Sequence, residues 1–194
     1  MFNIFTPNDP EIPRELLFDP DGKEKFGKYV PHDRSFVNSI ENYPYPYVIN
    51  RLCWEFPCVT PSDWSAQHYH KEKCSPQTVR DLKAAIDITV IKQGVLNLVF
   101  HPHGWIRSDQ IIELIDHTVA KHGKKVKFLT FREALDRLNK NLLNGQPLRD
   151  EKGRDNGVRV LDVNDDGFMD VFLGSTASPS SLQARFGAAW PSYY

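Results

Sequence analysis

Hydrophobic residues recur most regularly between residues 75 and 143, where they predict three helices. Within each helix they lie three or four positions apart, so they share one face. Serine or threonine stands at each expected N-cap and a glycine follows each expected end, which favours these boundaries. The predicted helices are residues 76–93, 109–122 and 131–143.

Short apolar runs precede the three helices and predict strands. Residues 47–54, 95–100 and 126–129 are rich in β-branched, aromatic or other apolar residues. The resulting order of strand and helix, repeated three times, is typical of parallel βα units. The sequence therefore predicts an α/β fold with one domain over residues 47–143.

The rest of the chain lacks this alternation. Residues 1–46 contain seven prolines and neither a helical nor a strand period, so we expect an irregular lead-in. Residues 144–157 are polar and rich in Gly, Asp and Arg, which indicates a linker, and residues 158–173 show a new strand alternation. Residues 174–194 are rich in Ser, Ala and Pro, and we expect a disordered tail.

Composition and charge narrow the classes of partner. The 194 residues are 40% hydrophobic, enough for one domain with a core, or for one domain and an appendage. With 24 basic and 25 acidic residues, the chain has no electrostatic footprint for nucleic acid, and no apolar run approaches the ~20 residues of a membrane span. The spacing of Cys53, Cys58 and Cys74 leaves open one disulfide with a spare thiol, or three thiols.

Two histidines, His101 and His103, follow the expected strand 95–100. In an extended chain, side chains two apart project from the same face, so this pair suits a metal site or an acid/base site. Alternatively, one histidine is satisfied by backbone groups and the other is solvated.

The other histidines carry a weaker signal. The cluster around His68, His70 and Cys74 has lysines between its members and no second group of metal-binding residues to complete it, which argues against a metal site there. His117 and His122 are expected at the surface.

Residues 162–170 carry the most specific local motif. Oxygen-bearing side chains stand at loop positions 1, 3, 5 and 9, with a glycine at position 6, as in the first part of a calcium loop. The expected ligands are Asp162, Asn164, Asp166, the backbone carbonyl of Phe168, and Asp170. Apolar neighbours indicate a β-hairpin instead of EF-hand helices; an acidic hairpin tip without an ion is the alternative. The segment resembles a single FG-GAP repeat, whereas a propeller needs several.

A longer resemblance rests on Trp54-Glu-Phe-Pro, Asp63-Trp64 and Val99-Phe-His101. Over about residues 40–143 the chain resembles the C-terminal part of a polysaccharide deacetylase of the NodB-homology group. The resemblance implies part of a (β/α) barrel that removes acetyl groups from carbohydrate with one divalent metal, zinc or similar. It further implies that His101 is the general acid, that Asp63 supports it, and that Trp64, with Trp105, contacts the substrate.

The chain also departs from this family. It contains neither a T-F-D-D motif nor an H-x-x-x-H pair, which carry the family's catalytic base and metal ligands. We therefore expect the C-terminal portion of a deacetylase-like enzyme, inactive alone, whose complete form acts on acetylated carbohydrate. The family resemblance suggests an extracellular or periplasmic location.

Two other readings stay open. In an amidohydrolase-like enzyme, His101 and His103 would both bind zinc, although that motif normally belongs to the first strand. In a non-catalytic carbohydrate-binding or cell-surface module, aromatic side chains would stack on sugar rings. The candidates for stacking are Tyr43, Tyr45, Tyr47, Trp54 and Trp105.

Overall fold

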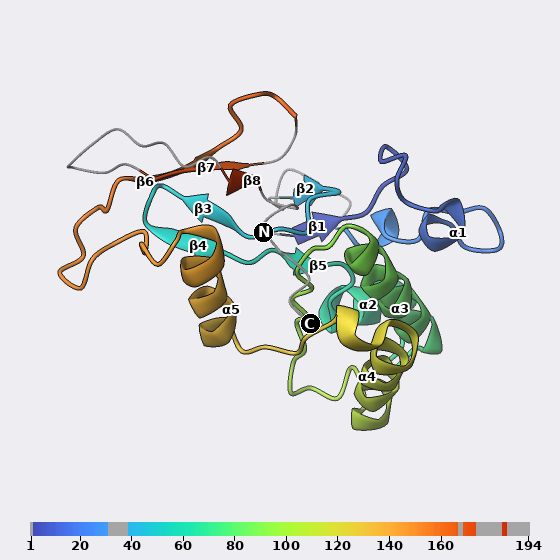
Figure 1. The fold of residues 1–194 in the computed structure, drawn as a ribbon. Helices are drawn as coiled ribbons and strands as arrows, with labels where there is room; N and C mark the ends of the chain where they lie inside the picture. The colour runs from blue at the N-terminus through green and yellow to red at the C-terminus, as the bar shows by residue number, and fades with distance from the viewer. Residues whose placement is uncertain (1, 31–38, 167–168, 174–183, 186–194) are drawn as a thin grey trace. The chain divides into compact units, whose positions relative to one another are not determined.

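The computed structural model describes residues 2–30, 39–166, 169–173 and 184–185, as helices, small sheets and connecting segments (Figure 1). The fold is mixed α/β, as predicted, and the strands of the described residues do not close into a barrel. The chain divides into two compact units. Unit 1 contains Met1–Tyr45 and Pro57–Val126, and unit 2 contains Pro46–Phe56 and Lys127–Tyr194. These bounds differ from the single expected domain over 47–143.

Unit 1 is built on a three-stranded parallel sheet in the order β2-β1-β5. Its strands are β1 (Phe2–Ile4), β2 (Ser39–Glu41) and β5 (Cys58–Val59). The central strand thus comes from the segment expected to be an irregular lead-in. Strands of two or three residues are too short to show a period in the sequence, which is why residues 1–46 looked irregular.

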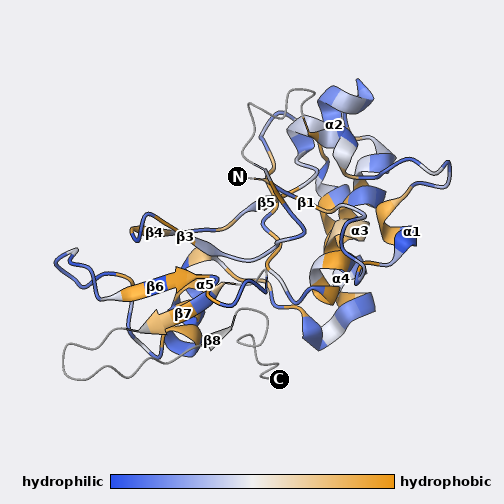
Figure 2. Ribbon diagram, turned by 90° about the horizontal axis from the view of Figure 1, so that it is seen from above, coloured by the Kyte–Doolittle hydropathy of each residue, from blue (hydrophilic) through white to orange (hydrophobic). Residues whose placement is uncertain are grey.

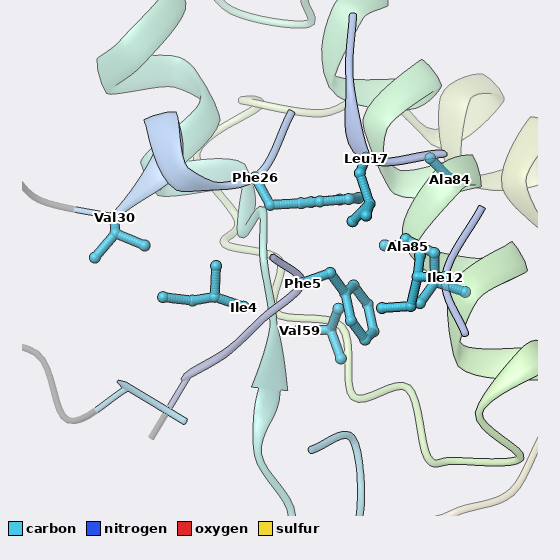
Figure 3. Close-up of a cluster of buried hydrophobic side chains, with 10 residues drawn as sticks. Ile4, Phe5, Ile12, Leu17, Phe26, Val30, Val59, Ala84 and Ala85 are labelled. Atoms are coloured by element: carbon cyan, nitrogen blue, oxygen red, sulfur yellow. The ribbon is translucent and has the colours of Figure 1, made fainter. Parts of the chain in front are cut away.

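The main core of unit 1 lies between this sheet and two helices, α1 (Arg14–Leu17) and α3 (Pro76–Ile91). Figure 3 shows its side chains converging from the N-terminal segment, β5 and α3. The cluster comprises Ile4, Phe5, Ile12, Leu17, Phe26, Val30, Val59, Ala84, Ala85 and Ile88. Full burial of one large apolar side chain stabilises a fold by about 1.5–3 kcal/mol, so residues 2–30 contribute much of the stability of this unit.

A second core cluster joins α3 to α4 (Ser108–His122). Its buried members are Val79, Leu82, Ile86, Ile106 and Leu114. The apolar stripe of α4 is broader than this contact, because Ile112, Ile115 and Val119 are exposed in the structure. Hydrophobic residues along α3 and α4 are orange in Figure 2. None of the described helices is long and apolar enough to cross a membrane.

The expected strand over 95–100 is an extended segment without a regular ladder. It has one parallel bridge, Cys58 with Asn97, and the Val59 N–H donates to the Asn97 carbonyl at 3.1 Å. A close approach to Pro44 fixes its start, where a Cβ on Gly94 would lie 2.6 Å from the Pro44 carbonyl oxygen. Residues 126–129 also lack strand structure; they follow the 3-10 turn Gly123–Lys125.

Unit 2 begins with a hairpin where one strand over 47–54 was expected. β3 (Tyr47–Ile49) pairs antiparallel with β4 (Cys53–Glu55). Asn50 and Arg51 have positive φ angles of 50° and 58°, the backbone conformation of a tight hairpin turn. The run therefore reverses direction in its middle.

The rest of unit 2 contains one helix and a second sheet. α5 (Phe131–Arg137) continues into a π-helical turn, Leu138–Leu142. β6 (Val158–Leu161) and β7 (Asp170–Leu173) form the predicted antiparallel hairpin, and β7 pairs with β8 (Ala184–Arg185). β6 and β7 are largely orange in Figure 2. The expected tail over 174–194 lies outside the described residues, except for β8.

A buried polar network ties the 3-10 turn Gly27–Tyr29 to α3 in unit 1. The Asp81 side chain is fully buried and pairs with the Lys28 ammonium at 2.9 Å. The Tyr29 hydroxyl donates to Asp81 at 2.5 Å and lies 2.9 Å from the Nε2 atom of His70. Since the tyrosine proton is directed to the carboxylate, His70 donates to the hydroxyl oxygen.

Candidate active site

The first candidate residue, Asp63, begins helix α2 (Asp63–His70). Ser62 caps this helix, because its hydroxyl accepts the Ser65 N–H at 3.1 Å while the Ser65 hydroxyl accepts the Ser62 N–H. The positive end of the helix dipole favours a carboxylate in the first turn. The capping box therefore fixes the backbone from which the Asp63 side chain projects.

The carboxylate of Asp63 holds His101 at two points. Its Oδ2 atom accepts the His101 backbone N–H at 2.6 Å, and its Oδ1 atom lies 2.7 Å from the ring atom Nδ1. Oδ1 also accepts the Trp64 backbone N–H at 2.8 Å. The Asp63 N–H in turn donates to the Val99 carbonyl at 3.4 Å. Both the position of the His101 backbone and the rotation of its ring are thus set by one side chain.

This arrangement defines the tautomer of His101. An oxygen that accepts a bond from imidazole requires the proton on Nδ1, so Nε2 is the nitrogen that can reach a substrate. The Asp63 side chain is 0% exposed, whereas the His101 side chain is 38% exposed. A buried carboxylate behind a solvent-facing imidazole is an arrangement suited to general acid/base chemistry.

A chain of aromatic ring contacts leads from His101 through Trp105 and His68 to Trp64. The rings of Trp64 and His68 are 4.1 Å apart, and His68 makes an edge contact with Trp105 at 6.3 Å. Trp105 lies 5.2 Å from the His101 ring and 4.7 Å from the His103 ring. We call Trp64, His68 and Trp105 the aromatic wall. Such a surface can stack on the apolar faces of a sugar ring.

The loop that carries Trp105 is anchored to the start of α3. The Cys74 N–H donates to the Trp105 carbonyl at 2.8 Å, and the Cys74 thiol contacts the Gly104 carbonyl at 3.4 Å. Gln110 of α4 donates to the Cys74 carbonyl at 3.0 Å. Gly104 has a φ of +67°, which a residue with a Cβ rarely adopts. The loop geometry therefore places Trp105 against His101.

His103 does not join His101 in a metal-ligand group. Their rings are stacked with 15° between the planes and 6.3 Å between the centroids. His68 contacts the Trp64 carbonyl through Nδ1, and His70 contacts Tyr29, so these two histidines serve separate partners. Within the part of the chain that the structure describes, no group of three close metal-binding side chains includes His101 or His103.

The calcium-like loop closes between β6 and β7. The Asp166 N–H is shared by side-chain oxygens of Asp162 and Asn164, each at 3.2 Å. Asp170 is buried, and its Oδ2 atom accepts a loop N–H at 3.1 Å. The expected carbonyl ligand, Phe168, lies outside the described residues. The oxygen atoms of the loop are thus gathered, and calcium binding stays a prediction.

The structure also shows where the tyrosines proposed to stack on sugar, and the three cysteines, lie. Tyr43 and Tyr45 are buried, with their rings in edge contact at 5.0 Å, so neither can stack on a sugar. Their apolar rings complete the interior instead. Cys53, Cys58 and Cys74 form no disulfide within the part of the chain that the structure describes.

A cluster that the sequence did not predict lies on α3 and α4. Asp87 contacts His117 and His122, which were expected at the surface but have side chains only 20% and 11% exposed. The two histidines are five positions apart, a spacing that does not place residues on one helix face. They nevertheless meet at Asp87, where His122 is the last residue of α4 and Gly123 ends the helix.

Comparisons with known proteins give no relative for this chain: no family model, no curated protein and no solved structure matches it. Assignment of its chemistry therefore rests on the side chains described above.

Proposed function

We propose that the pair Asp63 and His101 is the acid/base centre of a hydrolase that removes acetyl groups from carbohydrate. The observation that carries this proposal is the pair of hydrogen bonds that the Asp63 carboxylate accepts from His101, one from its backbone N–H at 2.6 Å and one from Nδ1 at 2.7 Å. A histidine held in this way presents Nε2 at a defined point, which proton transfer requires.

The chemistry of deacetylation fits this centre. Water adds to the acetyl carbonyl, the C–N or C–O bond breaks to release acetate, and the departing sugar nitrogen or oxygen must take up a proton. Nε2 of protonated His101 would donate that proton, and Asp63 would stabilise the positive ring during the reaction. The aromatic wall, in which Trp64 and Trp105 each contact the His68 ring, would orient the sugar.

The family that this chain resembles also uses a divalent metal, zinc or similar. A hydrolytic metal site needs about three protein ligands, and the described residues beside His101 do not supply such a group. The part of the reaction that we assign to this chain is therefore proton transfer and substrate orientation. The finer description of the fold as part of a deacetylase barrel belongs to the same proposal.

The amidohydrolase-like alternative, in which His101 and His103 bind one zinc ion together, is less well supported. Nδ1 of His101 is taken by Asp63, and the His103 ring is stacked 6.3 Å away, where the pair does not converge on one point. The second alternative is a sugar-binding module that stacks aromatic side chains on sugar rings. Of its proposed stacking residues, Trp105 can still serve, whereas Tyr43 and Tyr45 are buried and cannot. A module that only binds sugar would also have no need for a buried carboxylate behind His101.

We also propose that the loop over 162–170 binds calcium. The side-chain oxygens of Asp162 and Asn164 already face the same backbone N–H, so few rotations are needed to gather them around a cation. Carboxylate, amide and carbonyl oxygens are the ligands that calcium prefers.

The proposed substrate can be tested by titrating an N-acetylated chito-oligosaccharide into ¹⁵N-labelled protein. We expect shifts of the Trp64 and Trp105 indole signals and of the His101 ring. The chain has four tryptophans, so single Trp→Phe variants assign the signals. The matched control is the same oligosaccharide without acetyl groups, which should cause smaller shifts. Saturating ligand that leaves all three residues unchanged would contradict the proposal.

A further inference from the structure

The α3 and α4 pair carries a group of side chains that neither the acid/base centre nor the calcium-like loop uses. Asp87 of α3 and His117 and His122 of α4 place one carboxylate oxygen and two imidazole nitrogens within 4.8 Å of one another. Among the described residues this is the one group of three metal-binding side chains so close together. We propose that it is a binding site for a divalent transition metal, zinc above all.

The geometry directs the correct atoms inward. Nε2 of His117 lies 2.9 Å from Oδ1 of Asp87, and Nε2 of His122 lies 2.7 Å from the same oxygen. Tetrahedral zinc, with bonds of roughly 2.0–2.2 Å, holds its ligand atoms about 3.3 Å apart. Each imidazole nitrogen therefore needs to move only a few tenths of an ångström away from Oδ1 of Asp87 to admit an ion.

The second carboxylate oxygen is already anchored. Oδ2 of Asp87 pairs with the Lys121 ammonium at 2.8 Å, which leaves Oδ1 as the ligand atom. Ligating carboxylates in metal sites commonly have an outer partner of this kind, which fixes their orientation. The Lys121 charge opposes a cation, but its side chain is 53% exposed and can move toward solvent.

The protonation states also suit a metal. Burial raises the pKa of Asp87, but hydrogen bonds from Lys121, His122 and His117 outweigh it and hold the pKa below its ordinary value of 3.8. Asp87 is therefore a carboxylate at neutral pH. A metal ligand must be free of a proton at the ligating atom, so each imidazole has to carry its remaining proton on Nδ1 when an ion binds. Nε2 then offers its lone pair to the ion.

The ligand types decide between metals. Two imidazole nitrogens and one carboxylate oxygen favour zinc and similar ions, whereas calcium and magnesium prefer all-oxygen sites. The three ligands come from two helices, and the Asp87 and His122 side chains are 8% and 11% exposed. A bound ion would thus clamp the C-terminal end of α4 to α3, with water at the fourth position.

The test is titration of zinc chloride into the whole chain, followed by calorimetry and by ¹⁵N signals of the histidine rings. We expect one zinc per chain, Nε2 shifts at His117 and His122, and a melting temperature that rises with zinc concentration. Calcium at the same concentration should have no effect on these two rings. His122→Gln should lower zinc affinity at least about tenfold, since even loss of an outer partner costs roughly 10–100-fold.

The matched control is His103→Gln, which removes an exposed histidine outside the cluster and should leave zinc affinity unchanged. The ring shifts in the unmodified protein make the test independent of whether His122→Gln folds. Zinc that does not bind, or that binds while the His117 and His122 rings stay in their metal-free tautomer, would overturn the proposal. Equal affinity in wild type and His122→Gln would also overturn it.

Discussion

Asp63→Asn is the substitution that most sharply separates a built acid/base centre from a chance contact. The change keeps the shape of the side chain and replaces one carboxylate oxygen by an NH₂ group. In the native protein both oxygens accept N–H groups, Oδ2 from the His101 backbone and Oδ1 from Trp64 and the His101 ring. Whichever way the amide turns, its NH₂ group faces at least one N–H donor.

The expected magnitude follows from these bonds. A hydrogen bond to a charged group contributes about 1.5–3 kcal/mol, and an unsatisfied buried donor costs about 1–3 kcal/mol. Asparagine avoids burying a charge, which offsets part of this loss. We therefore expect Asp63→Asn to lower the free energy of unfolding of unit 1 by roughly 2–4 kcal/mol.

The assay combines urea unfolding with the ¹⁵N shifts of the His101 ring. If the NH₂ group faces the ring, His101 must accept at Nδ1 and carry its proton on Nε2, so the tautomer reverses. If it faces the backbone, the His101 amide should exchange faster with solvent. Asp116→Asn, at an exposed position of α4, is the control and should change stability by less than about 0.5 kcal/mol. An Asp63→Asn protein with wild-type stability, tautomer and amide exchange would refute the reasoning.

The remaining predictions concern other parts of the chain. Burial and the Lys28 charge lower the pKa of His70 from its ordinary value of 6.5, so the unfolded chain binds the proton first. The contribution of neutral His70 to the free energy of unfolding should be fully present above about pH 6.5 and be lost as the pH falls through the lowered pKa of the folded state. In urea unfolding across pH 5–7.5, His70→Gln should therefore reduce the dependence of stability on pH. Gly94→Ala should cost about 1–3 kcal/mol by thermal unfolding, because its Cβ would meet a backbone oxygen at 2.6 Å; a neutral result would mean that the segment shifts freely. Calorimetry with millimolar calcium should give a heat of binding for wild type and none for Asp166→Ala. The absence of heat in both proteins would refute calcium binding by residues 162–170.

The sequence predicted the long helices well and the sheets poorly. The helices expected over 76–93 and 109–122 are Pro76–Ile91 and Ser108–His122, because fifteen or more residues carry several turns of apolar spacing. Most of the strands have only two or three residues, which is too few to show alternation, whereas the four-residue strands β6 and β7 were predicted. Expected strand 95–100 is held instead by scattered contacts, and β1 was hidden in a proline-rich segment.

Of the two side-chain clusters described above, the sequence pointed to one and not to the other. The contact between Asp63 and His101 was implied by the family resemblance, and the structure brings the two residues together across 38 positions of the chain. Its catalytic role stays a prediction. The cluster of Asp87, His117 and His122 gave no signal in the sequence, since its carboxylate is 30 positions from His117 and its histidines are five positions apart, a spacing that does not share a helix face.

The central claim, that His101 transfers the proton, is tested most directly by turnover. The measurement is kcat for acetate release from N-acetylated chito-oligosaccharide, with the chain joined to a segment that supplies T-F-D-D and H-x-x-x-H motifs. His101→Asn should lower kcat by ~10²–10⁴-fold with little change in KM, because a positioned general acid acts in the transition state. His103→Asn, which leaves the Asp63 contact intact, should stay within about threefold of the wild-type kcat. A larger loss from His103→Asn than from His101→Asn would contradict the account.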